Sequence, residues 1–389
     1  MPENALNKKK SNKKSKLSAL FVEGKMDLTF LFLLLIILTV GLVMLFSASY
    51  VFADTYYGNS YHFITKQAGF AVFGVILMLL VSKFDYHIIR KFAVPFYIIM
   101  AIFLVVMLIL PPMVAGTSVK RWFSIGPINF QPSELAKFAV ILLLAHLIAA
   151  NQKLMKTFRF GFLFLGLTVG LICVLVVLEP HLSATVLIFL IGAVMMVVGG
   201  LQLRYIIGGL AVAATGVIVV MSGVIKYAQD RITFWLDPWS APVGEGYQTI
   251  QSLLAIGSGG WVGKGLGQSN QKHLWVPEPH NDFIFSIVCE ELGVIGAMVI
   301  IILFCLLMWR GFSIAVKAPD KFGSLLALGL TFQVGLQMTL NVLVVTNTIP
   351  NTGISLPFFS YGGTSLVILL VEMGIILGIS RSCNNKKTL

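Results

Sequence analysis

The chain has 389 residues, and its composition excludes a soluble globular protein. Hydrophobic residues make up 57% of it and charged residues only 11%, whereas an average soluble domain has about 25% charged residues. The formal net charge is +12. Nucleic acid is nevertheless excluded as a partner, because the cations lie in the N-terminal tail and in alternate short loops, as they do in membrane proteins.

Ten apolar segments follow a basic tail. Residues 1–25 carry seven lysines and too few apolar side chains to order a chain, so a disordered tail is predicted. A helix that crosses a bilayer needs roughly 20 mostly apolar residues. Such spans are predicted at about 27–47, 65–82, 92–110, 133–150, 160–178, 184–200, 205–225, 283–309, 322–346 and 364–380. The first is interpreted as a signal anchor, since its apolar stretch is too long for a cleaved signal peptide.

The distribution of cations orients these spans. With the N-terminus inside, the inner segments hold 20 of the 28 Lys and Arg residues, which predicts that both termini are cytoplasmic. The predicted fold is an all-α polytopic membrane domain over residues 26–381 with ten transmembrane helices, followed by a short cytoplasmic tail at 382–389. No internal repeat typical of a secondary transporter is visible.

Three outer loops, at 111–132, 226–282 and 347–363, contain many residues that break helices. The largest lies between predicted helices 7 and 8 and contains eight glycines and four tryptophans. Irregular backbone at membrane depth persists only where it is buried in protein or lines a wet cavity. Together the three loops predict a structured site at the outer membrane surface.

The first motif combines KRW at 120–122 with QPSELAK at 131–137. Ser133 is expected as an N-cap or first-turn residue. Glu134 and Lys137 are three residues apart and share a helix face. A charge near bilayer depth costs about 3 kcal/mol, so the two should pair. A structural ion pair would explain them, but the charged wall of a polar cavity is the favoured interpretation.

The second motif runs through the large loop, from RITFWLDPW at 231–239 to GYQ at 246–248. Its aromatic rings beside Arg231 are suited to stacking on a sugar while the cation holds a phosphate. They are equally suited to anchoring the loop in the membrane interface. The residues alone leave both interpretations open.

The third motif is GSGGWVGKGLG at 257–267. A nucleotide-binding loop is excluded, because Lys264 is followed by Gly265 rather than by Ser or Thr. A cradle of backbone N–H groups for a phosphate is an alternative. A tight, flexible loop is the favoured interpretation.

The fourth motif is PEPHNDFIF at 277–285, which places Asp282 where the large loop re-enters the membrane. Partial burial would raise the pKa of this carboxyl and make it a better general base. The alternative is a helix N-cap. Further along, helical geometry places Glu290 about 80° and Glu291 about 180° from Asp282, so at most one of them is expected to share its cavity. Both need partners in a span.

The fifth motif is LPFFSYGGTS at 356–365, which includes Ser360 and Gly362. Its proline and paired glycines predict a re-entrant loop that folds back into the outer cavity. In the last span Glu372 is another carboxylate that needs a partner, and Lys137 is the partner expected.

Metal and redox chemistry find little support. The four cysteines have no CxxC spacing, and HExxH and DxD are absent, so the cysteines are interpreted as small buried hydrophobes. His181 and His280, at the outer ends of spans, are interpreted as surface or capping histidines.

These five segments, in this order, resemble the SEDS family (FtsW, RodA and SpoVE) over residues 26–381. Because EPH at 278–280 resembles the division-type sequence, the FtsW and SpoVE branch fits better than RodA. Two positions depart from the family pattern: Asn281 replaces a threonine, and PHLSAT at 180–185 replaces PDLGT, so no role is assigned to that turn.

The resemblance implies a peptidoglycan glycosyltransferase that polymerises lipid II at the outer face of the bacterial cytoplasmic membrane, at the division septum. It places the essential aspartate on Asp282. The remaining substrate-binding or cavity residues expected are Glu134, Lys137, Lys120, Arg121, Trp122, Arg231, Gln248, His280, Ser360, Gly362 and Glu372.

The mechanism expected is inverting transfer with Asp282 as general base, with Lys137, Arg121 or Arg231 stabilising the diphosphate leaving group. No cofactor is assigned, and a divalent cation (Mg²⁺ or Mn²⁺) is the alternative. Expected partners are a class B penicillin-binding protein transpeptidase, other divisome proteins and membrane lipid. The alternative functions are a lipid II flippase and a non-catalytic scaffold for other wall enzymes.

Overall fold

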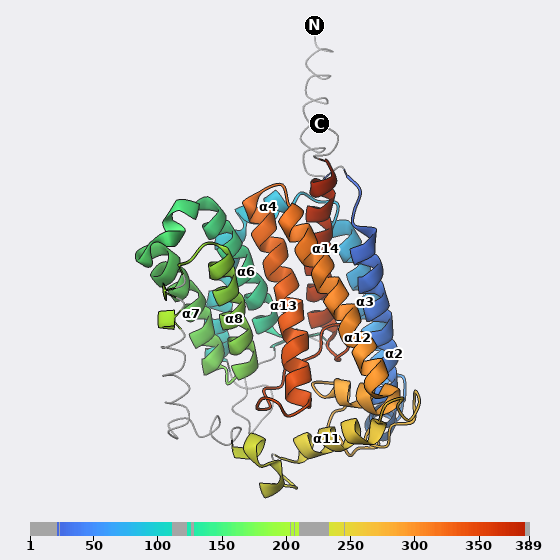
Figure 1. Cartoon of the computed structure of the whole chain (residues 1–389). Coiled ribbons are helices and arrows are strands. Elements are labelled where there is room, and N and C mark those ends of the chain that lie inside the picture. Colours follow the sequence, from blue (N-terminus) through green and yellow to red (C-terminus); the bar gives the residue numbers. More distant parts are fainter. Residues whose placement is uncertain are drawn as a thin grey trace.

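The computed structural model describes residues 22, 24–110, 123–125, 128–202, 204–205, 207–209, 233–244 and 246–385. In these parts it is a bundle of long helices (Figure 1). Most of the predicted N-terminal tail, residues 386–389 of the predicted C-terminal tail, most of the seventh predicted span and the expected site residues Lys120, Arg121, Trp122 and Arg231 lie outside the described residues. The C-terminal tail was predicted from residue 382, but α14 continues to Asn385.

Nine described helices coincide with nine of the ten predicted spans. They are α2 (Leu28–Tyr57), α3 (His62–Val81), α5 (Ala93–Ile109), α6 (Pro132–Ala150), α7 (Leu165–Leu178), α8 (Leu182–Val198), α12 (Ile284–Lys317), α13 (Lys321–Val345) and α14 (Gly363–Asn385). A π-helical turn, η2 (Phe158–Phe164), leads into α7. Within the described residues seven helices are long and apolar enough to cross a membrane, with η2 and α7 counted as one, and α5 and α8 are shorter apolar helices. The chain is therefore a multi-pass membrane protein.

Short elements connect these helices. They are α4 (Tyr86–Lys91), the antiparallel strands β1 (Phe123–Ile125) and β2 (Ile128–Phe130), the 3-10 turns η1 (Gln152–Lys156) and η4 (Pro238–Ser240), and α11 (Tyr247–Gly259). Helix α11 belongs to the large loop and lies across one end of the bundle (Figure 1).

The start of α2 and the end of α14 meet at the opposite end of the bundle from α11 (Figure 1). The backbone N–H of Asp27 donates to Ser380 Oγ at 3.0 Å, and Arg381 Nη1 donates to the carbonyl of Gly24 at 3.0 Å. The two ends of the helical domain therefore share one side, as an even number of crossings requires.

Small residues let neighbouring helices approach closely. Helices α3 and α14 pack along each other, and a Cβ on Gly374 would lie 2.6 Å from the Met78 carbonyl oxygen. Packing of this kind replaces the hydrophobic effect as the source of helix association in a membrane.

Helix α12 is interrupted at Gly293, whose φ of 67° and ψ of −172° are not helical. The glycine-rich loop caps both sides of the break. Its N–H groups at Lys264 and Gly265 donate to the Glu290 and Glu291 carbonyls, each at 3.0 Å, and on the other side Val294 N–H donates to the Gly260 carbonyl at 3.0 Å. These bonds satisfy backbone groups that a helix end leaves unpaired.

The backbone of this loop lies so close to the backbone of α12 that side chains at two of the glycine positions would not fit. A Cβ on Gly263 would lie 2.2 Å from the Glu291 carbonyl oxygen, and one on Gly293 would lie 2.3 Å from the Gly263 nitrogen. The segment is therefore a tight loop packed on α12, in agreement with the favoured interpretation. It is not a phosphate cradle, because the N–H groups of Lys264 and Gly265 are already bound.

The adjacent glutamates of α12 are both fully buried and both paired. Glu290 accepts from Lys264 Nζ at 2.6 Å, and Glu291 accepts from Lys272 Nζ at 2.8 Å and from Ser47 Oγ of α2. Additional bonds to Glu290 come from Ser258, Ser269, Asn270 and Gln271. Neither glutamate lines the cavity of Asp282. Together they fasten the large loop to α12 and α2.

Candidate active site

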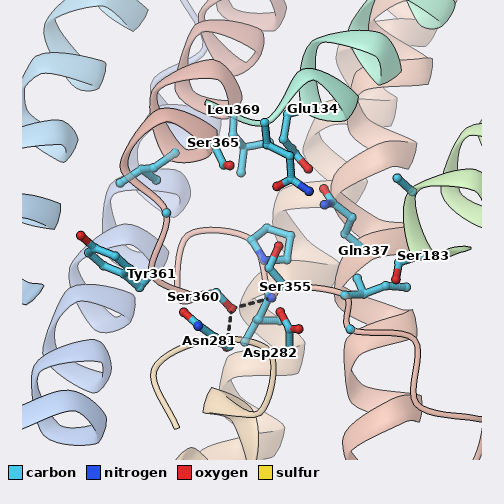
Figure 2. Close-up of a pocket in the computed structure, with 18 of the residues that line it drawn as sticks. Glu134, Ser183, Asn281, Asp282, Gln337, Ser355, Ser360, Tyr361, Ser365 and Leu369 are labelled. Atoms are coloured by element: carbon cyan, nitrogen blue, oxygen red, sulfur yellow. Dashed lines mark hydrogen bonds between the residues drawn. The ribbon is translucent and has the colours of Figure 1, made fainter. Parts of the chain in front are cut away.

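A polar cavity of about 270 Å³ lies where the outer loops meet the helix ends. Its walls come from the start of α6, the start of α8, the middle of α13, the start of α14 and the loops at 278–282 and 353–362 (Figure 2). The polar side chains among its lining residues are those of Gln131, Glu134, His181, Ser183, Glu278, Asn281, Asp282, Gln337, Ser355, Ser360, Tyr361 and Ser365.

Asp282 is held at the cavity through its backbone. The carbonyl of Asp282 accepts from Asn341 Nδ2 at 2.7 Å, and the same amide donates to the Ile354 carbonyl at 2.6 Å. The N-cap of α12 is Phe283, so Asp282 does not have the N-cap role considered as the alternative. Its half-buried side chain lines the cavity.

The loop that carries the fifth motif is bound to the turn of Asp282. Ser360 Oγ donates to the Asn281 carbonyl at 2.9 Å and accepts from Leu356 N–H at 2.8 Å (Figure 2). The side chain of Gln67, on α3, donates to the Ser360 carbonyl at 3.3 Å and accepts from Gly362 N–H at 3.2 Å. Ser360 and Gly362 thus line the cavity, and their hydrogen bonds also hold in place the loop at 353–362, which forms the floor of the cavity.

Gly353 brings the chain directly past the aspartate. Its φ of +69° is a left-handed conformation, and a Cβ there would lie 3.1 Å from Asp282 Oδ2 and 4.0 Å from Ser183 Oγ. Glycine is required both for the conformation and to leave open the space between Asp282 and Ser183.

Glu134 forms another wall, and Lys137 stands behind it. Lys137 Nζ lies 2.9 Å from Glu134 Oε1, and the lysine side chain is fully buried. Glu134 lines the cavity, whereas Lys137 does not. The ion pair expected from the sequence is present, and only its acidic half contacts the cavity.

Glu372 is buried in the bundle and lies away from the cavity lining. Its hydrogen-bond partner is Gln333 Nε2 at 2.8 Å, not the expected Lys137. The lysine does interact electrostatically with Glu372. Gln333 makes the direct hydrogen bond because it lies on the adjacent helix α13. This contact could not be predicted from the sequence, since the two residues are far apart along the chain.

His181 occupies the N-cap position of α8, as the capping interpretation expected, although its side chain makes no capping hydrogen bond and does not lie at the surface. His181 is buried, lines the cavity, and its Nδ1 lies 3.1 Å from Ser133 Oγ at the first turn of α6. The turn to which no role was assigned therefore supplies His181 and Ser183 to the cavity. Hydrogen bonding between the starts of α6 and α8 accounts for this burial.

His280 is also buried rather than at the surface or in a capping position. Its ring packs against Phe52, Phe63 and Tyr361, with centroid separations of 4.9, 4.2 and 6.0 Å. Burial lowers the pKa of His280 to about 4, so the ring is neutral at pH 7. It does not line the cavity, and it supports the wall behind Tyr361.

Gln248 and the aromatic residues of the second motif lie outside the cavity. Gln248 accepts from Asn351 Nδ2 at 3.3 Å, and Trp235 Nε1 donates to the Asn347 carbonyl at 3.0 Å. Trp239 is largely exposed. In the described part of the loop, these contacts fasten α11 and its neighbours to the connection between α13 and α14.

Gln337, which lines the cavity, and Asn341, which holds the backbone of Asp282, are among the site residues that the sequence reasoning missed. They are four residues apart on α13, and in the view of Figure 2 Gln337 lies between Glu134 and Asp282. Two amides at helical spacing in an apolar span are a signal that could have found them, because polar groups in a span face the bundle interior.

The described lining of the cavity is acidic. It contains the carboxylates of Glu134, Glu278 and Asp282 and no Lys or Arg. Among the described residues no three His, Cys, Asp or Glu side chains come together as a group that could hold a metal.

The fold and cavity define a multi-pass membrane protein with a polar, acidic site where the loops at 278–282 and 353–362 fold back over the helix ends. The chain belongs to the FtsW, RodA and SpoVE family, since the family model described as "Cell cycle protein" matches residues 27–385.

Individual relatives are similar over nearly their whole length. Stage V sporulation protein E of Bacillus subtilis (strain 168) is 40% identical over 359 residues, 91% of this chain and 97% of the relative. A probable peptidoglycan glycosyltransferase FtsW of Geobacter sp. (strain M18) is 38% identical over 361 residues, 92% of this chain and 97% of the relative.

Solved structures share the fold. A chain from a structure described as "Structural coordination of polymerization and crosslinking by a peptidoglycan synthase complex" superposes with a TM-score of 0.77 at 27% identity, covering 92% of this chain and 98% of that one. The rod shape determining protein RodA of Thermus thermophilus gives a TM-score of 0.68 at 25% identity, covering 92% and 97%.

Proposed function

We propose that this protein is a peptidoglycan glycosyltransferase that polymerises lipid II into glycan strands. The family and the relatives named as peptidoglycan glycosyltransferases support this reaction class. The observation that carries the mechanism is the position of Asp282, whose carboxyl lines a polar cavity built from the outer loops.

In the proposed reaction Asp282 is the general base. Its carboxylate takes the proton of the 4-hydroxyl of a GlcNAc on the acceptor lipid II. The oxygen attacks C1 of the donor MurNAc as the bond from C1 to the diphosphate breaks. Undecaprenyl diphosphate leaves with the bonding electrons, and the configuration at C1 is inverted. The proton remains on Asp282 until solvent removes it.

Charge develops on the diphosphate as it leaves, and cations stabilise it. Lys137 supports the site from behind Glu134. We also assign stabilisation of this charge to Arg121 and Arg231, which lie in predicted outer loops and outside the described residues. Gln337, aimed into the cavity, is suited to bind sugar hydroxyls.

The proposed orientation places the cavity outside and both termini in the cytoplasm. The opposite placement of α11 and of the ends of the helical domain supports it, as does the cation distribution. The ten-helix domain then spans residues 26–381, between an N-terminal segment at 1–25 and a short C-terminal segment at 382–389. The expected site is the division septum, and the expected partners are a class B penicillin-binding protein and other divisome proteins.

The experiment measures strand formation from lipid II by the purified protein with its cognate class B penicillin-binding protein. Wild type is compared with Asp282→Ala, Asp282→Asn and Glu278→Gln, the last a matched control because Glu278 is another carboxylate of the same cavity. Strands are expected from wild type and Glu278→Gln, and none from either Asp282 variant.

Thermal unfolding and partner binding control for misfolding of the Asp282 variants. Normal polymerisation by folded Asp282→Ala would refute its role as base. Movement of lipid II between leaflets by a complex that forms no strands would replace the enzyme with a flippase. A wild-type complex that neither forms strands nor moves lipid II between leaflets would favour a non-catalytic scaffold.

A further inference from the structure

A second cavity, of about 290 Å³, lies at the end of the bundle opposite Asp282. It is formed where α2, α12 and α14 meet, and the proposed reaction does not use it. Its lining residues are Met26, Asp27, Leu28, Thr29, Arg310, Ser313, Ile314, Lys317, Ser380 and Cys383.

This cavity lies at the level of the other membrane surface. Helix α2 begins at Leu28, in this cavity, and ends at Tyr57, so it rises about 44 Å, which matches the roughly 40–45 Å thickness of a bilayer with its headgroups. Trp309, beside the cavity, is 72% exposed, and tryptophan is enriched at membrane interfaces. In the proposed orientation the cavity faces the headgroups of the cytoplasmic leaflet.

The cavity has one positive charge in excess. Arg310 is paired with Asp27, with Nη2 2.7 Å and Nε 2.8 Å from Asp27 Oδ2. The second cation, Lys317, is exposed and has no ion pair among the described residues. Two cations and one acid therefore suit a ligand with a single negative charge.

The remaining polar groups suit a phosphate. Hydroxyls of Thr29 and Ser313 line the cavity, whereas the hydroxyl of Ser380 already donates to the Leu377 carbonyl. Arg310 uses Nε and Nη2 for Asp27, and the described residues make no bond to its Nη1. Hydroxyl, guanidinium and ammonium donors together form the usual set that binds phosphate oxygens.

Apolar side chains border the cavity where lipid would lie. Leu28 and Phe32 of α2 are each 66% exposed, and Val316, next to Lys317, is 85% exposed. A ligand that combines a phosphate with acyl chains satisfies both the polar lining and this apolar border. Free phosphate, which has no acyl chains, would make no use of the exposed apolar side chains beside the cavity.

We propose that this cavity binds the phosphate group of an anionic phospholipid from the cytoplasmic leaflet. Lys317 and Arg310 hold the headgroup, and the acyl chains lie along the exposed apolar surfaces of α2 and α12. Asp27 sets the selectivity, because it neutralises Arg310 and limits the site to one net positive charge.

The test uses native mass spectrometry of the full-length protein, released from mixed micelles that contain phosphatidylglycerol and phosphatidylcholine with the same acyl chains. Wild type is expected to retain phosphatidylglycerol in preference to phosphatidylcholine. Lys317→Gln is expected to weaken that retention roughly fivefold, the effect of one basic residue near an anionic lipid. Asp27→Asn, which releases Arg310, is expected to strengthen it.

The matched control is Lys321→Gln, since Lys321 is an exposed lysine at the same end of the bundle that does not line the cavity. It is expected to retain the lipid like wild type. Equal retention by Lys317→Gln and wild type, or equal loss in Lys321→Gln, would overturn the site. Displacement of the lipid by inorganic phosphate would overturn the lipid as its ligand.

Discussion

The side-chain amide of Asn341 donates one hydrogen bond to the carbonyl of Asp282 and another to the carbonyl of Ile354, at 2.7 and 2.6 Å. Asn341 is fully buried on α13. One amide therefore joins the turn that carries the candidate base to the loop that forms the floor of the cavity.

Replacement of Asn341 is expected to impair catalysis more than binding. Asn341→Ala removes both bonds, so the free energy of unfolding should fall by about 2 kcal/mol. Because a small misplacement of a catalytic group costs about 10²-fold in rate, kcat for polymerisation should fall by that order with KM for lipid II little changed. Asn341→Asp should be worse, since a carboxylate repels both carbonyls.

Thr346→Val is the control for this prediction, because Thr346 lies at the end of α13 and bonds only within its own segment. Its kcat should equal that of wild type. A proportional loss of kcat and folded protein in Asn341→Ala would show a structural role alone.

Gly353→Ala is expected to block the site. The left-handed φ costs a non-glycine residue about 1–2 kcal/mol, and the new methyl group would lie 3.1 Å from Asp282 Oδ2. Gly58→Ala separates the two effects, because Gly58 has a similar φ of +64° with nothing within 4 Å of a Cβ. Both variants should lose similar stability in thermal unfolding, and only Gly353→Ala should lose polymerisation.

The buried pair of Lys272 and Glu291 is expected to show strong coupling. Lys272→Met leaves the carboxylate without its cation and should lower the free energy of unfolding by about 3–5 kcal/mol. Adding Glu291→Gln should recover most of that loss, since neither charge is then left unpaired. A double-mutant cycle from denaturant unfolding in detergent measures the coupling, and simple additivity of the two single losses would contradict the prediction.

Acid is expected to destabilise the protein through His280. Its pKa is about 4 in the folded protein and about 6.5 in an unfolded chain. Below pH 6.5 His280 binds a proton in the unfolded state but stays neutral in the folded state. The stability that is present above pH 6.5 is therefore lost as the pH falls toward 4. The shift corresponds to about 3 kcal/mol at the lower end.

The measurement compares the thermal midpoint of wild type and His280→Phe between pH 7 and pH 5. Phenylalanine keeps the packing against Phe52 and Phe63 without a titrating group. Burial raises the pKa of Glu179 to about 8, so its protonation changes stability with pH in the opposite direction. This contribution is the same in wild type and in His280→Phe, and it cancels in the comparison. A wild-type midpoint that falls no more than that of the variant would contradict the assignment.

The sequence predicted the helices well because each span is a local pattern. Nine described helices match predicted spans, and the motif residues Glu134, Asp282, Ser360 and Gly362 come together at one cavity. These motifs lie at the ends of spans, so the order of crossings alone brings them to one face of the membrane.

Contacts between distant helices could not be predicted. Glu291 is paired with Lys272 and Ser47, and Glu372 with Gln333, because packing angles and helix rotation select partners that spacing along the chain does not reveal. His181 was misjudged for the same reason: its burial depends on Ser133, 48 residues away.

The break at Gly293 leaves α12 in two pieces, and the outer piece directly follows Asp282. A helix cut at one glycine has little bending stiffness of its own. The glycine-rich loop bridges the break, with hydrogen bonds to the backbone on both sides and an ion pair from Lys264 to Glu290. Further along the chain, Lys272 pairs with Glu291. The placement of Asp282 therefore depends on the glycine-rich loop as well as on Asn341, and not on an unbroken helix after it.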